Sequence, residues 1–596
     1  MVTYSSRKEV PSAEKWNLAD IYQDMNAWEN DYQTVIELIE KLRAFDGAIE
    51  GAQSLCDYLQ LREQASYLYS KLYVFASLQM DTDTRVSSSQ ALLDKAGQLG
   101  QKISEATSFF MPFLLTLDEE TLKQYISEIK ELSYFEESLL ESYRYKKHVL
   151  SKEKEEILSK MGEALSSPKQ TFGMINNADI KFGKVTNDDH KKVPLTRGMY
   201  AKLIEDEDRS KRKEAYKAYY KPYVQLQNTI ASTLSAAIKN NKLTSEIRNY
   251  PSALERALFS DNVPKDVYEN LIQSAKENIQ PLHKYMRIRK QQLGVDELRA
   301  YDLSIPLVKE AKQVISYEEA YETMLQSLQP LGEDYVQTLR SFKTKRYIDV
   351  RETPGKRSGA YNLGLYGVHP FVLLNHQDNI SSLFTLTHEM GHAMHSYYSS
   401  QYQPRIKAGY SIFVAEVAST VNEVLLIRYL LKQTNDNQTK KYLLNHFIDQ
   451  FKGTFFTQVM FAEFEKIIHE KAQNEQPLNA EAFSQVYETL FREYNGPGIV
   501  FDDEVKYGWT RIPHFYRPFY VYKYATGFAS AIDLADRLIK GEQETRHSYL
   551  EFLKSGSSDY PLELLKRTGV DLSRPEPIHN ALSVFNKLVD EFSRQV

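Results

Sequence analysis

The stretch ISSLFTLTHEMGHAMHSYYS, residues 380–399, decides the predicted fold. Its apolar residues recur at the spacing of one helix face. Asp378 and Asn379 lie directly before it, and both residue types commonly cap the start of a helix. The pattern therefore predicts a helix that begins after Asn379, and this prediction does not depend on the histidines.

Three polar residues within this helix form the spacing His-Glu-x-x-His. On a helix His388 and His392 point the same way, so two imidazole nitrogens can bind one metal ion. Glu389 projects to the flank of this pair, where it is well placed to accept a proton from a water at the open metal position. The alternative is a chance arrangement of two packed or exposed histidines. We interpret the nearby His395 as a structural histidine.

The next predicted helix supplies a third ligand. In GYSIFVAEVASTVNEVLLIRYLL, residues 409–431, Glu416 interrupts an otherwise apolar or small face. A buried carboxylate without a partner is costly, and metal coordination accounts for it. Two histidines and one carboxylate favour zinc, although cobalt or manganese can substitute. Glu423, seven residues later, either orients a ligand histidine or is an ordinary salt-bridge partner or acid on the helix surface, and the sequence leaves this open.

A glycine-rich segment before the metal-binding helix predicts a small sheet. Residues 341–379 contain short β-type runs, and GAYNLGLYGVHPFVLLN, residues 359–375, predicts a pair of strands. An open edge of such a pair can hydrogen-bond an extended peptide. The loop LYGVHP, residues 365–370, either closes over a substrate or is a plain hairpin turn.

Most of the remaining chain shows helical periodicity. Long antiparallel helices are predicted from about residue 27 to 167, and a second helical tract from 200 to about 242. Turns and brief strands are predicted between them, at 168–198. We therefore expect a helical domain at 1–195 and a catalytic domain at 196–596. The charged run EDEDRSKRKEAYKAYYK, residues 205–221, is interpreted as a solvated helix face rather than a partner site.

Composition excludes several classes of protein. The chain has 596 residues and a formal charge of −6, with basic residues interleaved among acidic ones, so no nucleic-acid partner is expected. No apolar run is long enough to cross a membrane. A lone cysteine, Cys56, excludes an internal disulfide framework, and the first residues lack the pattern of a secretory signal. A multi-lobed cytoplasmic protein is expected.

Four motifs together resemble the thimet oligopeptidase and oligoendopeptidase F family of zinc peptidases, and the second branch more closely. They are HEMGHAMH at 388–395, FVAEVASTVNE at 413–423, the strands SGAYN and PFVLLN at 358–362 and 370–375, and HFYRPFYVYKYATG at 514–527. The resemblance is specific from about Gly359 to Gly527. It implies a mainly α, two-lobed zincin-type metallopeptidase with a small sheet beside the active-site helix and a deep substrate channel.

The resemblance also implies roles for individual residues. His388, His392 and Glu416 would hold one Zn²⁺ per chain, and Glu389 would be the catalytic acid/base. His514 and tyrosines of the C-terminal motif would stabilise the oxyanion. The motif contains four tyrosines, Tyr516, Tyr520, Tyr522 and Tyr524. We favour Tyr520 and Tyr524 for this role, and core packing is the alternative for most of the four.

The sequence thus predicts a zinc-dependent endopeptidase that hydrolyses internal bonds of short peptides. One alternative is a zinc exopeptidase that releases dipeptides, which would need a group to capture a charged terminus. Another is a non-catalytic helical peptide-binding protein. The sequence leaves the oligomeric state and the preferred peptide open.

Overall fold

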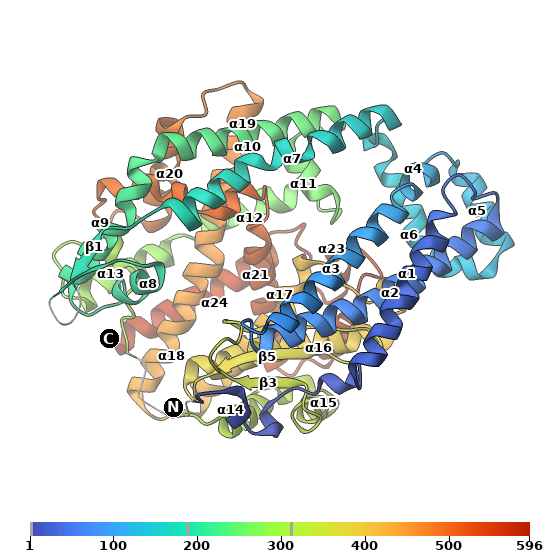
Figure 1. Ribbon diagram of the computed structural model, residues 1–596. Coiled ribbons are helices and arrows are strands. Elements are labelled where there is room, and N and C mark those ends of the chain that lie inside the picture. Colours follow the sequence, from blue (N-terminus) through green and yellow to red (C-terminus); the bar gives the residue numbers. More distant parts are fainter. Residues whose placement is uncertain (1–3, 187–190, 310–313) are drawn as a thin grey trace. The chain divides into compact units, whose positions relative to one another are not determined.

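The computed structural model describes residues 4–186, 191–309 and 314–596, and it is mostly helical with two small sheets (Figure 1). The mainly α prediction is confirmed. The contacts divide the chain into two compact units that interleave along the sequence. The first comprises Met1–Glu153, Val314–Tyr410 and Leu553–Ser558, and the second Lys154–Gln313, Ser411–Phe552 and Asp559–Val596. The predicted domain boundary at 195/196 stays a prediction.

Long helices form the N-terminal part of the first unit. Helices α1 (Met25–Arg43), α2 (Ala52–Thr82) and α3 (Ser87–Thr107) pack on one another, as Figure 1 shows in blue. The predicted long helices are therefore present up to Thr107 and again from residue 152, where α7 (Lys152–Met174) begins. Beyond it the chain forms shorter helices and 3-10 turns up to His148; the helices are α4 (Phe110–Leu114), α5 (Glu119–Glu128) and α6 (Glu136–Glu141).

A three-stranded sheet lies in the first unit. Its order is β3 (Ile348–Arg351), β5 (Phe371–His376), β4 (Tyr361–Leu363), with β3 parallel and β4 antiparallel to the central β5. Helix α16 (Ile380–Tyr402) follows β5 and contacts both β5 and β4, while α14 (Tyr317–Ser327) packs on α16 and contacts α15 (Glu333–Thr344). The predicted sheet beside the metal-binding helix is confirmed.

The N-terminal segment is tied to this sheet by buried charges. The Lys356 ammonium is fully buried, lies 2.8 Å from a carboxylate oxygen of Asp349 and donates to the carbonyls of Arg351 and Leu374. Arg7 forms a second ion pair with Asp349. Because a buried charge is tolerated only when it is paired and hydrogen-bonded, these contacts hold the strand and the segment before α1 together.

The second unit is helical apart from one hairpin, β1 (Lys184–Thr186) with β2 (Lys192–Pro194), where the turn-and-strand region was predicted. Residues 168–174 of that region belong instead to α7 (Lys152–Met174), and residues 187–190 lie outside the described part. Helices α17 (Ile412–Gln433) and α24 (Glu576–Gln595) pack against α21 (Tyr522–Ile539). The other helices are α8 (Arg197–Leu203), α9 (Arg209–Gln225), α10 (Gln227–Ile247), α11 (Ala253–Phe259), α12 (Lys265–Glu277), α13 (Gln280–Gln292), α18 (Asn437–Gln450), α19 (Thr457–Gln473), α20 (Ala480–Asn495), α22 (Gln543–Lys554) and α23 (Pro561–Arg567).

The charged run at 205–221 is only partly a solvated face. Arg212 is 2% exposed and donates to Asp302, which is fully buried; Arg209 donates to the same carboxylate. The interpretation as a solvated face was wrong for these two arginines, because their partner lies about 90 residues away in sequence. Lys213, Lys217 and Lys221 of the same run are exposed, as predicted.

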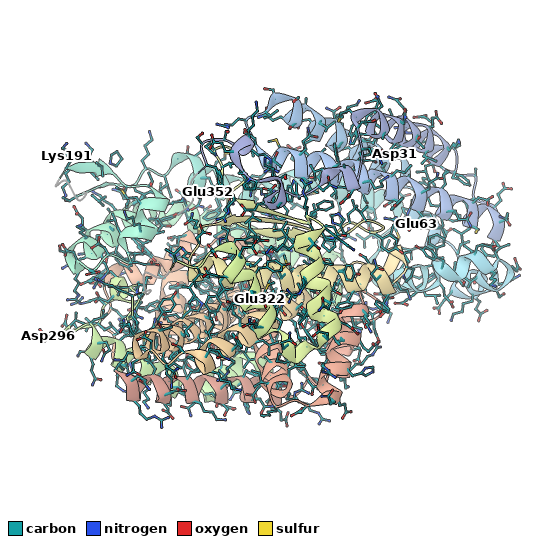
Figure 2. All side chains as sticks on the ribbon, turned by 90° about the horizontal axis from the view of Figure 1, so that it is seen from below. Asp31, Glu63, Lys191, Asp296, Glu322 and Glu352 are labelled. Carbon is teal, nitrogen blue, oxygen red and sulfur yellow. The ribbon has the colours of Figure 1, made fainter. Side chains whose placement is uncertain are left out.

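Charged side chains of both signs extend from the surface. Lys191, Asp296, Glu322 and Glu352, labelled in Figure 2, are examples, and all four are exposed. Among the described residues, no helix is both long enough and apolar enough to pass through a membrane.

Candidate metal centre and catalytic segment

Helix α16 begins where the sequence predicted. The side chain of Asn379 accepts a hydrogen bond from the backbone N–H of Ser382 at 2.8 Å, which makes Asn379 the N-cap. Strand β5 ends only three residues earlier, at His376. The short connection places the helix directly behind the sheet.

Asp378 does not cap the helix, although it was predicted to do so. Its backbone has φ +53°, and its carboxylate accepts from Arg351 at 2.7 Å inside the protein. Arg351 also donates to Glu14 at 2.8 Å. Asp378 therefore fastens the strand-to-helix corner to β3 and leaves the capping to Asn379.

His388 and His392 lie one helical turn apart on α16 and are both half-buried. Their ring centroids are 4.8 Å apart. Glu389 lies beside them on the same helix and is 7% exposed. The structure therefore gives the two imidazoles and the neighbouring carboxylate the local arrangement that the spacing predicted, while the roles of these residues stay predictions.

Glu416 lies in the first part of α17 and is half-buried. One of its carboxylate oxygens accepts from the Ser419 hydroxyl at 3.2 Å. Taken one atom from each residue, the candidate ligand atoms of His388, His392 and Glu416 all lie within 4.8 Å of one another.

This donor set suits zinc. Two neutral imidazoles and one carboxylate are a common catalytic zinc set, and they leave a fourth position open.

The segment from His514 to the first turn of α21 brings His514, Tyr520 and Tyr524 together. The His514 ring centroid lies 6.2 Å from that of Tyr520 and 6.3 Å from that of Tyr524, and the two tyrosine rings are 5.4 Å apart. Burial raises the pKa of Tyr524 above its ordinary value, and the neighbouring Tyr520 hydroxyl and Glu416 charge raise it further. Tyr524 therefore keeps its proton and can act as a hydrogen-bond donor.

The other two tyrosines of this motif belong to the core. Tyr516 is 8% exposed, stacks on Phe172 at 4.4 Å between ring centroids, and forms a hydrogen bond of 2.7 Å with Thr233. Tyr522 is fully buried against Tyr268 and Phe413. Core packing was the predicted alternative for most of these tyrosines, and it holds for this pair.

Sequence analysis missed Glu465, which orders this segment. It lies in α19, is fully buried, and accepts a hydrogen bond of 3.0 Å from the backbone N–H of Phe519. Phe519 has φ +53°, a conformation that costs free energy for a bulky residue. The signal in the sequence was an acidic residue within the apolar run of α19, the same signal that identified Glu416.

Two open assignments near the helices can now be described. His395 is buried and stacks on Tyr410 at 3.7 Å between ring centroids, in agreement with a structural histidine. Burial lowers its pKa to about 3, so it is neutral. Glu423 accepts a hydrogen bond of 2.7 Å from Gln450 of α18. Its carboxylate is therefore held by a neighbouring helix and is not an exposed surface acid.

Strand β4 is an edge of its sheet, because β5 covers only one side of it. Residues 365–370 join β4 to the antiparallel β5 as a hairpin connection, with the N–H of Val368 bonded to the carbonyl of Leu365 at 3.1 Å. His369 is held by Asp20 at 3.0 Å and stacks on Tyr347. The loop therefore has the geometry of the plain hairpin, and closure over a substrate stays a prediction.

Comparisons with known proteins agree with this arrangement. The model described as Peptidase family M3 matches residues 202–584, and the model described as Oligopeptidase F matches residues 114–182. Oligopeptidase PepF of Bacillus subtilis is 42% identical over 586 residues, which cover 98% of this chain and 88% of that protein. Group B oligopeptidase PepB of Streptococcus agalactiae is 37% identical over 99% of this chain and 98% of that protein.

Solved structures give the same result. A structure from Chlamydophila abortus aligns over 100% of both chains with a TM-score of 0.91 and 32% identity. The oligoendopeptidase-F from Enterococcus faecium aligns over 95% of this chain and 98% of that one, with a TM-score of 0.76 and 34% identity. The fold and the site thus define a helical metallopeptidase. The chain belongs to peptidase family M3, as the resemblance to oligoendopeptidase F implied.

The close packing of α17 on α21 generates a prediction about Gly527. A Cβ at this position would lie 3.6 Å from the Cβ of Glu416 and 3.8 Å from the carbonyl oxygen of Phe413. Gly527→Ala therefore fits, and we expect it to keep activity and to raise the free energy of unfolding by up to about 1 kcal/mol. Gly527→Val adds two methyl groups that must displace Glu416, and turnover should fall by about 10- to 100-fold.

Peptide hydrolysis and urea unfolding of both variants provide the measurement. Equal activity in Gly527→Val and the native protein would show that the spacing of α17 and α21 does not position Glu416.

Proposed function

We propose that the protein is a zinc-dependent endopeptidase that cleaves internal bonds of short peptides. The observation that carries this proposal is the grouping of His388, His392 and Glu416, whose donor atoms suit a zinc ion and leave a coordination position open. Membership of family M3 and similarity to proteins named oligopeptidases support the substrate class.

The chain's own residues would act in the following order. An extended peptide would pair its backbone with the edge strand β4, a mode that reads few side chains and so allows broad sequence preference. Glu389 would accept the proton of the attacking water and pass it to the leaving amine. A bound zinc ion would act as a Lewis acid and lower the pKa of a coordinated water.

Tyr524 and His514 are the proposed donors to the negative charge that develops on the carbonyl oxygen. Tyr524 stays neutral, for the reasons given above, and so keeps its proton. Desolvation and the Arg517 charge lower the pKa of His514, so the neutral ring offers an N–H donor near pH 7. Such donors each contribute about 3–4 kcal/mol to the stabilisation of a transition state. Tyr520, whose ring lies 5.4 Å from that of Tyr524, would help to orient the Tyr524 hydroxyl.

Replacing Glu389 tests the proposed general base. Glu389→Gln keeps the shape of the side chain but cannot accept a proton, so turnover should fall by about 10²- to 10⁴-fold. Zinc content, measured by mass spectrometry of the purified protein, should match that of the native chain. Near-native turnover with the metal retained would remove Glu389 from this role.

The four tyrosines of the 514–527 motif provide a test with internal controls. Tyr524→Phe should lower kcat by about 10²- to 10³-fold with a smaller change in KM, because the hydroxyl acts mainly in the transition state. Tyr520→Phe should have a smaller effect in the same direction. Tyr516→Phe and Tyr522→Phe change core residues and should alter stability more than kcat. Four equal effects on kcat would contradict the assignment.

A ladder of quenched peptides of increasing length, blocked at both ends, tests the function itself. The proposal predicts internal cleavage, loss of activity above a limiting length, and reversible silencing by a chelator. Mass spectrometry of the products, with the same peptides also tested unblocked, separates this from the alternative: release of dipeptides from the unblocked peptides alone would identify an exopeptidase.

A further inference from the structure

A polar cavity lies in the second unit, and none of the proposed catalytic or metal-binding residues lines it. Its volume is about 180 Å³. Two cationic side chains, Lys452 and Arg511, line it together with several tyrosines, namely Tyr200, Tyr216, Tyr220, Tyr487 and Tyr494. These residues come from distant parts of the sequence, so no single motif indicated the cavity.

The Arg511 guanidinium has no carboxylate partner. Its Nε donates to the Tyr220 hydroxyl at 2.8 Å, and within the described part of the chain it forms no ion pair. The neighbouring groups that affect its charge are tyrosines, and Tyr220 does most to raise the pKa of Arg511. Arg511 is half-buried, and withdrawing a guanidinium from water without a counter-charge costs free energy. The cavity therefore carries an uncompensated positive charge.

Lys452 adds to this charge only partly. Its ammonium donates to the carbonyl of Leu303 at 2.5 Å, and its nearest carboxylate oxygen, from Asp449, is 3.9 Å away. Burial lowers the pKa of Lys452 to about 8, so it is mostly protonated at pH 7. Burial also raises the pKa of Tyr487 and Tyr200, which therefore stay neutral and can donate their hydroxyl protons.

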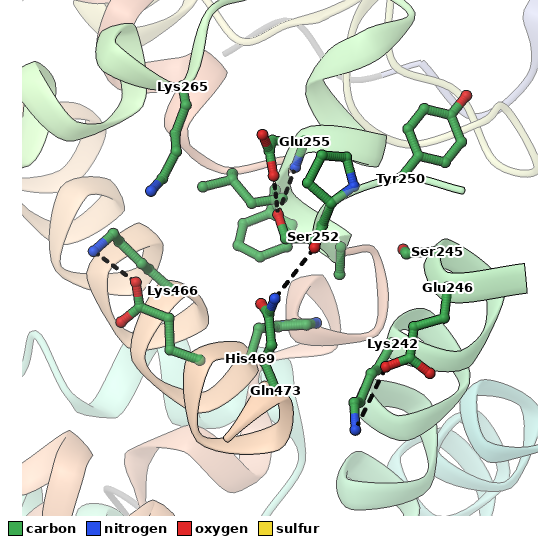
Figure 3. Close-up of a pocket in the computed structure, with 15 residues that line it drawn as sticks. Lys242, Ser245, Glu246, Tyr250, Ser252, Glu255, Lys265, Lys466, His469 and Gln473 are labelled. Atoms are coloured by element: carbon green, nitrogen blue, oxygen red, sulfur yellow. Dashed lines mark hydrogen bonds and ion pairs between the residues drawn. The ribbon is translucent and has the colours of Figure 1, made fainter. Parts of the chain in front are cut away.

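In a different cavity of the same unit, each positive side chain is paired with a carboxylate (Figure 3). It has a volume of about 250 Å³ and is lined by three lysines. Each of these pairs with a glutamate four residues later: Lys242 with Glu246, Lys265 with Glu269, and Lys466 with Glu470. No positive charge is left over for a ligand there. Arg511 lacks such a partner.

We propose that the cavity at Arg511 binds a compact anion, either a halide or a small carboxylate such as acetate. The guanidinium would supply the charge and two of its N–H groups. The Tyr220 hydroxyl accepts from Arg511 and so can donate its own proton to the same ligand. A cavity of about 150 Å³ holds a benzene molecule, so this one admits a small anion with water but excludes a peptide.

Binding can be measured without reference to peptidase activity. Thermal unfolding is followed at constant ionic strength while a bulky sulfonate buffer salt is replaced by sodium chloride or sodium acetate. The native midpoint should rise by about 2–4 °C as the site saturates. The chloride and acetate arms show which anion is preferred. Crystals soaked in sodium bromide should show an anomalous peak beside Arg511.

Variants separate a binding role from a structural one. In Arg511→Met the midpoint should no longer depend on the anion, and in Tyr220→Phe the dependence should weaken. Arg574→Met removes an exposed arginine that does not line this cavity, and this variant should respond to anions like the native chain. A bromide peak with an anion response that disappears in Arg511→Met supports the site. No peak, or parallel responses in native and Arg511→Met proteins, overturns it, and the peak alone decides if that variant does not fold.

Discussion

The strand-to-helix corner from His376 to Asn379 is the constraint on which the proposed site depends. Each residue along a helix turns by about 100°, so a start displaced by one residue would rotate every side chain of α16 away from its direction. Asn379 sets this start by capping, and the buried Arg351–Asp378 ion pair ties the corner to β3. The cap at Asn379 thus sets the directions of both imidazoles, although it lies nine residues before His388.

The position of Glu416, the proposed third ligand, depends on the close packing of α17 against α21. Gly527 and the alanines around it let α21 approach α17 closely enough that an added Cβ at 527 would touch both the Glu416 side chain and the Phe413 carbonyl. A larger residue at 527 would therefore move the backbone or the Cβ of Glu416, and with it the half-buried carboxylate.

Sequence analysis succeeded where the signal was local. The helix after Asn379, the strands at 359–375 and the position of His388 and His392 side by side on that helix all follow from short-range periodicity. It failed where the deciding partner was distant in sequence, as for Arg212 with Asp302 and Asp378 with Arg351. In both cases, residue types typical of exposed or capping positions are instead in buried ion pairs.

In the 514–527 motif, tyrosines occur at every second position from 516 to 524 apart from 518. This alternating pattern could not identify which tyrosines lie beside His514. The segment passes from a 3-10 turn to a helix through Phe519, whose left-handed backbone changes the direction of the side chains that follow. Burial raises the pKa of Glu465 well above its ordinary value, which favours the neutral form of the carboxyl group that accepts the Phe519 N–H. A neutral acceptor avoids the cost of a buried charge while it satisfies the strained residue. The separation of core Tyr516 from Tyr520 and Tyr524 thus depends on a residue of another helix, about 50 positions earlier.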